Sequence, residues 1–68
     1  MKTFKVTFEN NKAVSVIPID SSYSIDLNID NPEGKLILKW FIIMANDEQE
    51  GIKVANKIAH NIMISTHA

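Results

Sequence analysis

Two stretches of the chain alternate strictly between apolar and polar residues, and this period of two constrains the fold more than any other feature. In residues 3–9 the apolar positions are Phe4, Val6 and Phe8. In residues 23–30 they are Tyr23, Ile25, Leu27 and Ile29. A β-strand that buries one face and exposes the other produces this alternation. Both stretches are therefore predicted to be strands of a sheet with one core face.

Two further strands are predicted between and after these stretches. Residues 9–12 indicate a turn, because Asn10 and Asn11 tolerate left-handed backbone conformations. Residues 13–19 then form a strand, and Pro18, which has no N–H to donate, places the end of that strand at a sheet edge or outside the sheet. Residues 31–34, Asn-Pro-Glu-Gly, predict a tight turn before a fourth strand over residues 35–45.

The last third of the chain has the spacing of a helix. Asn46 is predicted to be the N-cap, with Gln49 three residues later and acidic residues in the first turn. The apolar residues on one side are Ile52, Val54, Ala55, Ile58, Ala59, Ile62 and Met63. The polar residues opposite them are Lys53, Asn56, Lys57 and His60. Gly51 falls on the apolar side and predicts a close approach to the sheet, whereas residues 65–68 are expected to fray.

These elements predict a single α+β domain over residues 1–68. Its architecture is a two-layer sandwich, in which one C-terminal helix covers one face of a four-stranded antiparallel sheet in the order ββββα. A chain this short buries only about 60% of the surface that its unfolded form exposes, so its core is small. The sequence has no cysteine, which removes disulfides and thiolate metal sites as a supplement. A second subunit is the expected supplement.

The charge composition argues against nucleic acid as a partner. Seven lysines oppose eight carboxylates, and the chain has no arginine, the side chain that makes bidentate contacts with phosphate. Residues 1–9 lack the apolar run of a signal peptide, and the apolar run 36–45 is about half as long as a membrane-spanning helix. A cytoplasmic protein without membrane contact is expected.

The start of a calcium loop is suggested by three oxygen-bearing residues at alternate positions, Asp26, Asn28 and Asp30. A calcium loop also needs glycine at its sixth position and glutamate at its twelfth. Here these positions are Asn31 and Ile37. Because Leu27 and Ile29 continue the strand alternation, the polar spacing is attributed to the exposed face of a strand, and no metal is expected.

No catalytic constellation is found in the remaining polar residues. His60 and His67 lie seven positions apart, which does not match the spacing of zinc ligands. The serines near Asp20 are Ser21, Ser22 and Ser24, a composition typical of turns. We therefore expect no enzyme activity and no cofactor, although a small-ligand or catalytic role around Tyr23 and the Asp20 loop is kept as a third hypothesis.

The fourth strand has more apolar residues than one sheet face can hold. Leu36, Leu38, Trp40, Ile42 and Met44 alternate with Ile37, Phe41 and Ile43. A strand that is apolar on both faces is usually central and covered. A central position would require the connection at residues 20–22 to cross three strand spacings, which three residues barely reach. A simple meander is therefore expected, and it places the fourth strand at an edge. Self-association would then cover it, through Ile37, Lys39, Phe41 and Ile43, or through the other set if the register is reversed.

The leading hypothesis is therefore a protein-interaction module that forms a homodimer or binds another protein through residues 35–45 and the sheet face that the helix leaves uncovered. The alternative is a dimeric nucleic-acid-associated regulator with a weak lysine surface of Lys5, Lys12 and Lys39. A stacking platform of Trp40 and Phe41 is not expected, because adjacent residues of a strand point to opposite faces.

Overall fold

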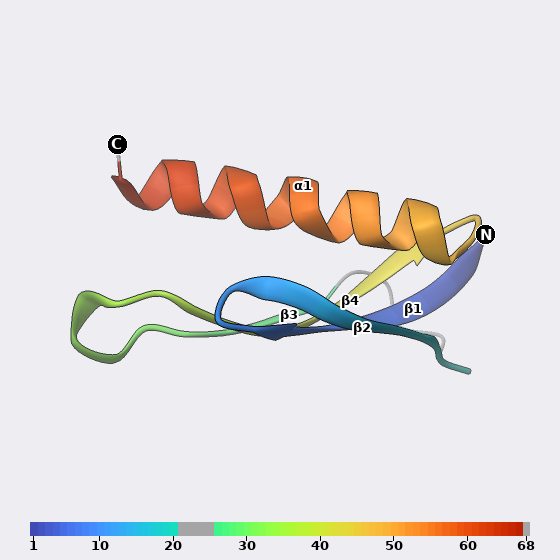
Figure 1. The fold of residues 1–68 in the computed structure, drawn as a ribbon, viewed down its shortest axis with the longest axis horizontal. Coiled ribbons are helices and arrows are strands. Elements are labelled where there is room, and N and C mark those ends of the chain that lie inside the picture. Colours follow the sequence, from blue (N-terminus) through green and yellow to red (C-terminus); the bar gives the residue numbers. More distant parts are fainter. Residues whose placement is uncertain (21–25, 68) are drawn as a thin grey trace.

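The computed structural model describes residues 1–20 and 26–67 and confirms the predicted two-layer α+β architecture. The strands are β1 (Lys2–Glu9), β2 (Lys12–Pro18), β3 (Asp26–Asp30) and β4 (Ile37–Ala45). A short 3-10 turn, η1 (Pro32–Gly34), links β3 to β4, and the helix α1 (Glu48–His67) follows. Figure 1 shows α1 lying along one face of the sheet. Tyr23 and Ile25, expected in the third strand, lie outside the described residues.

The strand order is β2-β1-β4-β3, with each neighbouring pair antiparallel. The expected meander is therefore wrong: β4 is a central strand whose residues 40–45 pair with β1, for example Ile43 with Phe4. The reason is the length of the β2 to β3 connection. β2 ends at Pro18 and β3 begins at Asp26, so residues 19–25, rather than three residues, cross the roughly 14 Å between the two edges.

The core lies between the central strands and the helix. It consists of Phe4, Val6, Phe8, Leu38, Phe41, Ile43, Ala45, Ala55 and Ala59. The rings of Phe8 and Phe41 have centroids 4.5 Å apart. Around this cluster pack the half-buried residues Ala13, Val16, Ile29, Leu36, Val54, Ile58 and Ile62. The alternation in the first strand thus predicted its buried face correctly.

A β-bulge at Lys39 decides which residues of β4 face the helix. Asn28 is opposite Trp40, but the next residue of β3, Ile29, is opposite Leu38, so Lys39 is an extra residue on β4. One extra residue reverses the alternation. Leu38 therefore shares the helix-facing side with Phe41, and the predicted grouping of Leu38 with Trp40 is wrong.

The hairpin between β1 and β2 has the predicted left-handed turn, with φ of 53° at Asn10 and 62° at Asn11. The Asn11 side chain also reaches the start of β4, which the sequence did not predict. Its Nδ2 donates to the Leu36 carbonyl at 3.0 Å, and its Oδ1 accepts from the Leu38 N–H at 2.9 Å. One amide thus fixes the hairpin to the central strand. At the other end of β2, Pro18 lies on an edge strand, as predicted.

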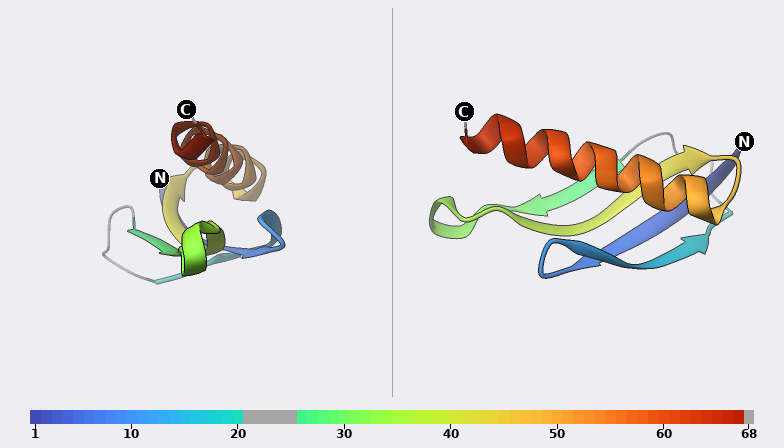
Figure 2. Two further views of the ribbon diagram at one scale, coloured as in Figure 1. Left: turned by 90° about the vertical axis from the view of Figure 1, so that its left-hand side faces the viewer. Right: turned by 45° about the horizontal axis from the view of Figure 1, so that its top comes forward.

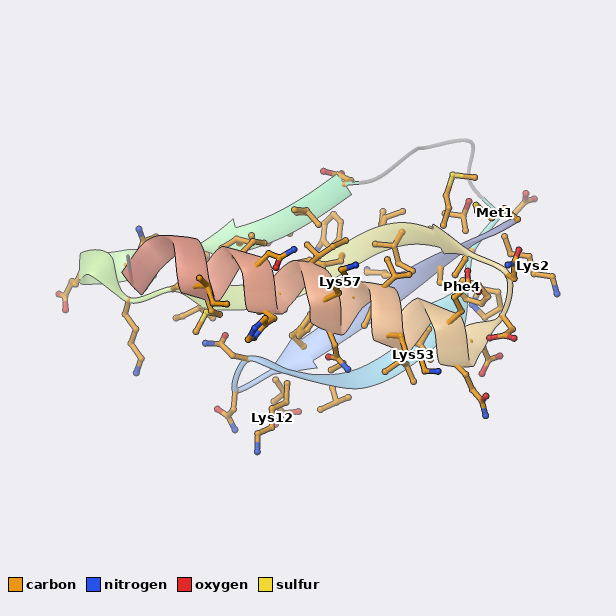
Figure 3. The ribbon with its side chains drawn as sticks, turned by 90° about the horizontal axis from the view of Figure 1, so that it is seen from above. Met1, Lys2, Phe4, Lys12, Lys53 and Lys57 are labelled. Carbon is orange, nitrogen blue, oxygen red and sulfur yellow. The ribbon has the colours of Figure 1, made fainter. Side chains whose placement is uncertain are left out.

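The helix begins one residue later than predicted and continues further. Asp47 is the N-cap, because its Oδ1 accepts the Glu50 N–H at 2.8 Å, while the Glu50 carboxylate accepts from Asn46. The helix extends to His67, whereas residues 65–68 were expected to fray. Its predicted polar side is exposed, as Lys53 and Lys57 illustrate in Figure 3. Ile52, predicted to face the sheet, is 38% exposed.

Gly51 is buried against the sheet, and the contacts around it predict that alanine would be tolerated. A Cβ at this position would lie 3.5 Å from Ile43 Cδ1 and 3.6 Å from Phe4 and Val16, which are ordinary contact distances. Alanine also favours a helix by about 1 kcal/mol relative to glycine. Gly51→Ala is therefore expected to raise the melting temperature by about 4–8 °C, measured by circular dichroism.

Gly34 provides the control for this substitution. Its φ of +80° is a conformation that alanine adopts only with strain, so Gly34→Ala is expected to lower the melting temperature. A lower melting temperature for Gly51→Ala as well would show that the helix cannot accept even one methyl group against the sheet.

Candidate protein-interaction surface

The predicted interface is the sheet face opposite α1, here called the open face. Figure 2 shows from two directions that α1 lies on one side of the sheet and that no described element covers the other side. Paired residues of neighbouring strands point to the same face. Across the open face, one row is Ile17, Lys5, Ile42 and Asp26. The next row is Ser15, Thr7, Trp40 and Asn28.

An apolar stripe runs along β4 in the middle of this face. It consists of Ile37, Trp40, Ile42 and Met44. Met44 is 40% exposed and the other three are half-buried, and on the edge strand β2 Ile17 is 49% exposed. The polar residues of β1 separate Ile17 from the stripe. A central strand thus presents large apolar side chains on the face that lacks a helix.

The four residues that the sequence predicted as the interface do not all lie on the open face. Ile37 lies in the apolar stripe, and Lys39 lies at the bulge beside it. Phe41 and Ile43 are 0% exposed beneath α1, so their assignment to an exposed interface is wrong. The bulge at Lys39 explains the division, since it moves Ile37 to the face opposite Phe41. The other set of β4 residues, with Trp40, Ile42 and Met44, supplies the open face.

Two lysines place positive charge on or beside the apolar stripe. The Lys5 ammonium lies 5.2 Å from the centroid of the Trp40 ring, a cation–π distance. Lys39 Nζ lies 3.7 Å from Asp30 Oδ2 in an exposed ion pair. Asp26 lies in the same row as Lys5, two strands away. The open face therefore combines an apolar middle with charges of both signs.

The three lysines proposed for nucleic acid do not form one patch. Lys5 lies over Trp40, and Lys39 is paired with Asp30. Lys12 lies at the β1–β2 hairpin, where Figure 3 labels it. Asp26 and Asp30 share the open face with Lys5. Phosphate binding needs a continuous positive footprint.

The polar residues that resembled a calcium loop lie on an exposed strand. Asp26, Asn28 and Asp30 are at alternate positions of β3, and all three are exposed. Among residues 1–20 and 26–67 there is no group of three or more histidine, cysteine or acidic residues that could hold a metal ion. Of the residues named for catalysis, His60 and Asp20 are exposed, while Ser21, Ser22, Tyr23 and Ser24 lie outside the described residues.

Two hollows lie near the start of the helix, at the end of the molecule where β1 begins. One, of about 370 Å³, is lined by Lys2, Phe4, Pro18, Asp47, Glu48 and Gln49. The other, of about 600 Å³, is lined by Met1, Lys2, Thr3, Pro18, Ile19 and Asp20. In the first hollow, the Asp47 carboxylate already caps α1 by accepting the Glu50 N–H.

Comparison of the chain with protein-family models, curated proteins and solved structures gives no match. Within the part of the chain that the structure describes, no helix has the length and apolar character required to cross a membrane.

Proposed function

We propose that this chain is a small cytoplasmic protein-interaction module that forms a homodimer through the open face of its sheet. The observation that carries the proposal is the apolar stripe. Trp40, Ile42 and Met44 lie on a central strand, on the face away from the helix. Central strands of single-helix sandwiches commonly carry polar residues on such a face, and a contiguous apolar patch there marks an interaction site.

The size of the chain supports association as the reason for the stripe. A domain of 68 residues has a small core, and this one is supplemented by no disulfide, because the sequence has no cysteine. Stacking two sheets face to face would bury the stripe in a second core about 10 Å thick. The dimer is then more stable than either subunit alone.

Ile42→Thr is expected to weaken the dimer about tenfold or more, because it removes apolar surface from the middle of the stripe while keeping a β-branched side chain. The measurement is solution mass by light scattering and analytical ultracentrifugation over a range of concentrations. Val14→Thr is the matched control, since Val14 is 57% exposed and borders Ile52 of α1 rather than the open face. It is expected to leave the mass unchanged.

A wild-type chain that stays monomeric at every concentration would refute the proposal. The nucleic-acid alternative is tested with the same proteins. Binding to DNA or RNA that weakens steeply between low and moderate salt would favour the alternative, because release of counterions from phosphate gives that dependence.

A further inference from the structure

The position of Lys5 restricts what can cover the open face. Its ammonium lies over Trp40, and its register partner on β4 is Ile42, so any molecule that buries the stripe also desolvates this charge. A buried ammonium without an acidic partner is strongly unfavourable. The covering surface must therefore be apolar in its middle and must carry a carboxylate about one strand spacing from its centre.

The same chain has a surface of this description. Lys5 on β1 and Asp26 on β3 are both paired with Ile42, so they lie in one row on opposite sides of β4. Within the described residues, Lys39 has Asp30 as an ion-pair partner and Asp26 has no such partner. A second copy can thus supply the carboxylate that Lys5 lacks.

Two arrangements of a twofold face-to-face dimer place these charges differently. If the twofold axis runs along β4, β1 of one copy lies over β3 of the other, and Lys5 meets the partner's Asp26. If the axis runs across the strands, β1 lies over β1, and Lys5 meets the partner's Lys5. The first arrangement forms two ion pairs per dimer, whereas the second places like charges together.

We propose that the homodimer has its twofold axis along β4, with Ile42 at its centre and Lys5 paired with the partner's Asp26 on both sides. This inference rests on the proposed function. Aligned sheets pack at about 30° to one another, which displaces residues one strand from the axis by only about 2.4 Å, a distance that a lysine stem accommodates. Lys39, near the axis, is neutralised by Asp30 of its own chain at 3.7 Å.

Charge exchange between the two positions tests the axis. Lys5→Glu and Asp26→Lys each convert both attractive pairs into repulsive ones, and each is expected to raise the dissociation constant about tenfold. The double variant, Lys5→Glu with Asp26→Lys, restores opposite charges and is expected to dimerise about as tightly as the wild type. Ultracentrifugation measures the constants, and circular dichroism verifies that each variant is folded.

Mixing the wild type with the double variant distinguishes the two axes. With the axis along β4, a mixed dimer places lysine against lysine and acid against acid, so native mass spectrometry should show fewer mixed dimers than the roughly one half of random association. Mixed dimers above one half would place the axis across the strands and overturn the inference. A double variant as weak as the single ones would overturn it too. A monomeric wild type would instead refute the proposed function itself.

Discussion

Replacement of Phe41 by alanine is expected to lower the free energy of unfolding by about 3–5 kcal/mol. The Phe41 side chain is 0% exposed beneath α1, and its ring centroid is 4.5 Å from that of Phe8. Removing the ring leaves a cavity that a close-packed core fills only in part. Because a domain of this size has little stability to lose, the variant is expected to be largely unfolded at room temperature.

Urea denaturation followed by circular dichroism measures this loss. Trp40→Ala is the matched control, since Trp40 is the preceding residue on β4 but lies half-buried on the open face. It is expected to cost less stability in the monomer and to weaken the dimer instead. A Phe41→Ala variant that keeps the wild-type urea midpoint but dimerises more weakly would contradict this expectation. It would support the interface position that the sequence pattern predicts for Phe41.

Replacement of Asn11 by glycine is expected to cost about 2 kcal/mol of unfolding free energy. Glycine accepts the φ of 62° without strain, so the loss isolates the side chain. That side chain donates to the Leu36 carbonyl and accepts the Leu38 N–H, at 3.0 and 2.9 Å, in a half-buried position. Without it, two backbone groups at the start of β4 lose their partner.

Asn10→Gly is the control for this effect. Asn10 has nearly the same backbone conformation, with φ of 53°, but its side chain is exposed. Its replacement is expected to change the unfolding midpoint little. Equal losses in the two glycine variants would mean that the turn conformation, and not the bridge to β4, is what Asn11 contributes.

The elements of the fold could be predicted because each carries a strong local pattern. The alternation of Phe4, Val6 and Phe8 fixed the buried face of β1, and the helical spacing after Gly51 identified the side of α1 that packs on the sheet. These patterns depend on neighbouring residues alone. They require only that one side of each element be apolar.

The strand order could not be predicted in the same way, because alternation does not identify a strand's neighbours. The apolar character of β4 on both faces does indicate a central strand, but the sequence pattern predicts a shorter connection before β3 than the structure has. The sequence pattern also gives no indication of the bulge at Lys39. Every residue near Lys39 on β4 is apolar, so a reversal of faces leaves no trace in the pattern.

Of the four residues that the sequence predicted for the candidate surface, Ile37 and Lys39 lie on or beside the open face, whereas Phe41 and Ile43 are buried beneath α1. An excess of apolar side chains in residues 35–45 can be counted from the sequence, but their distribution between two faces depends on the bulge. The ion pair of Lys39 with Asp30 and the position of Lys5 over Trp40 arise from strand pairing. These two contacts can be recognised only when the pairing register of the strands is known.

The pairing of β1 with β4 determines when the chain can fold during its synthesis. Lys2 pairs with Ala45, so the sheet's central ladder joins two segments that leave the ribosome far apart in time. The β1–β2 hairpin is synthesised first, and its apolar face stays exposed until both β4 and α1 can pack with it. Until β4 and α1 are available, the apolar face of this hairpin has no partner within the chain, and exposed apolar surface of this kind favours misassociation.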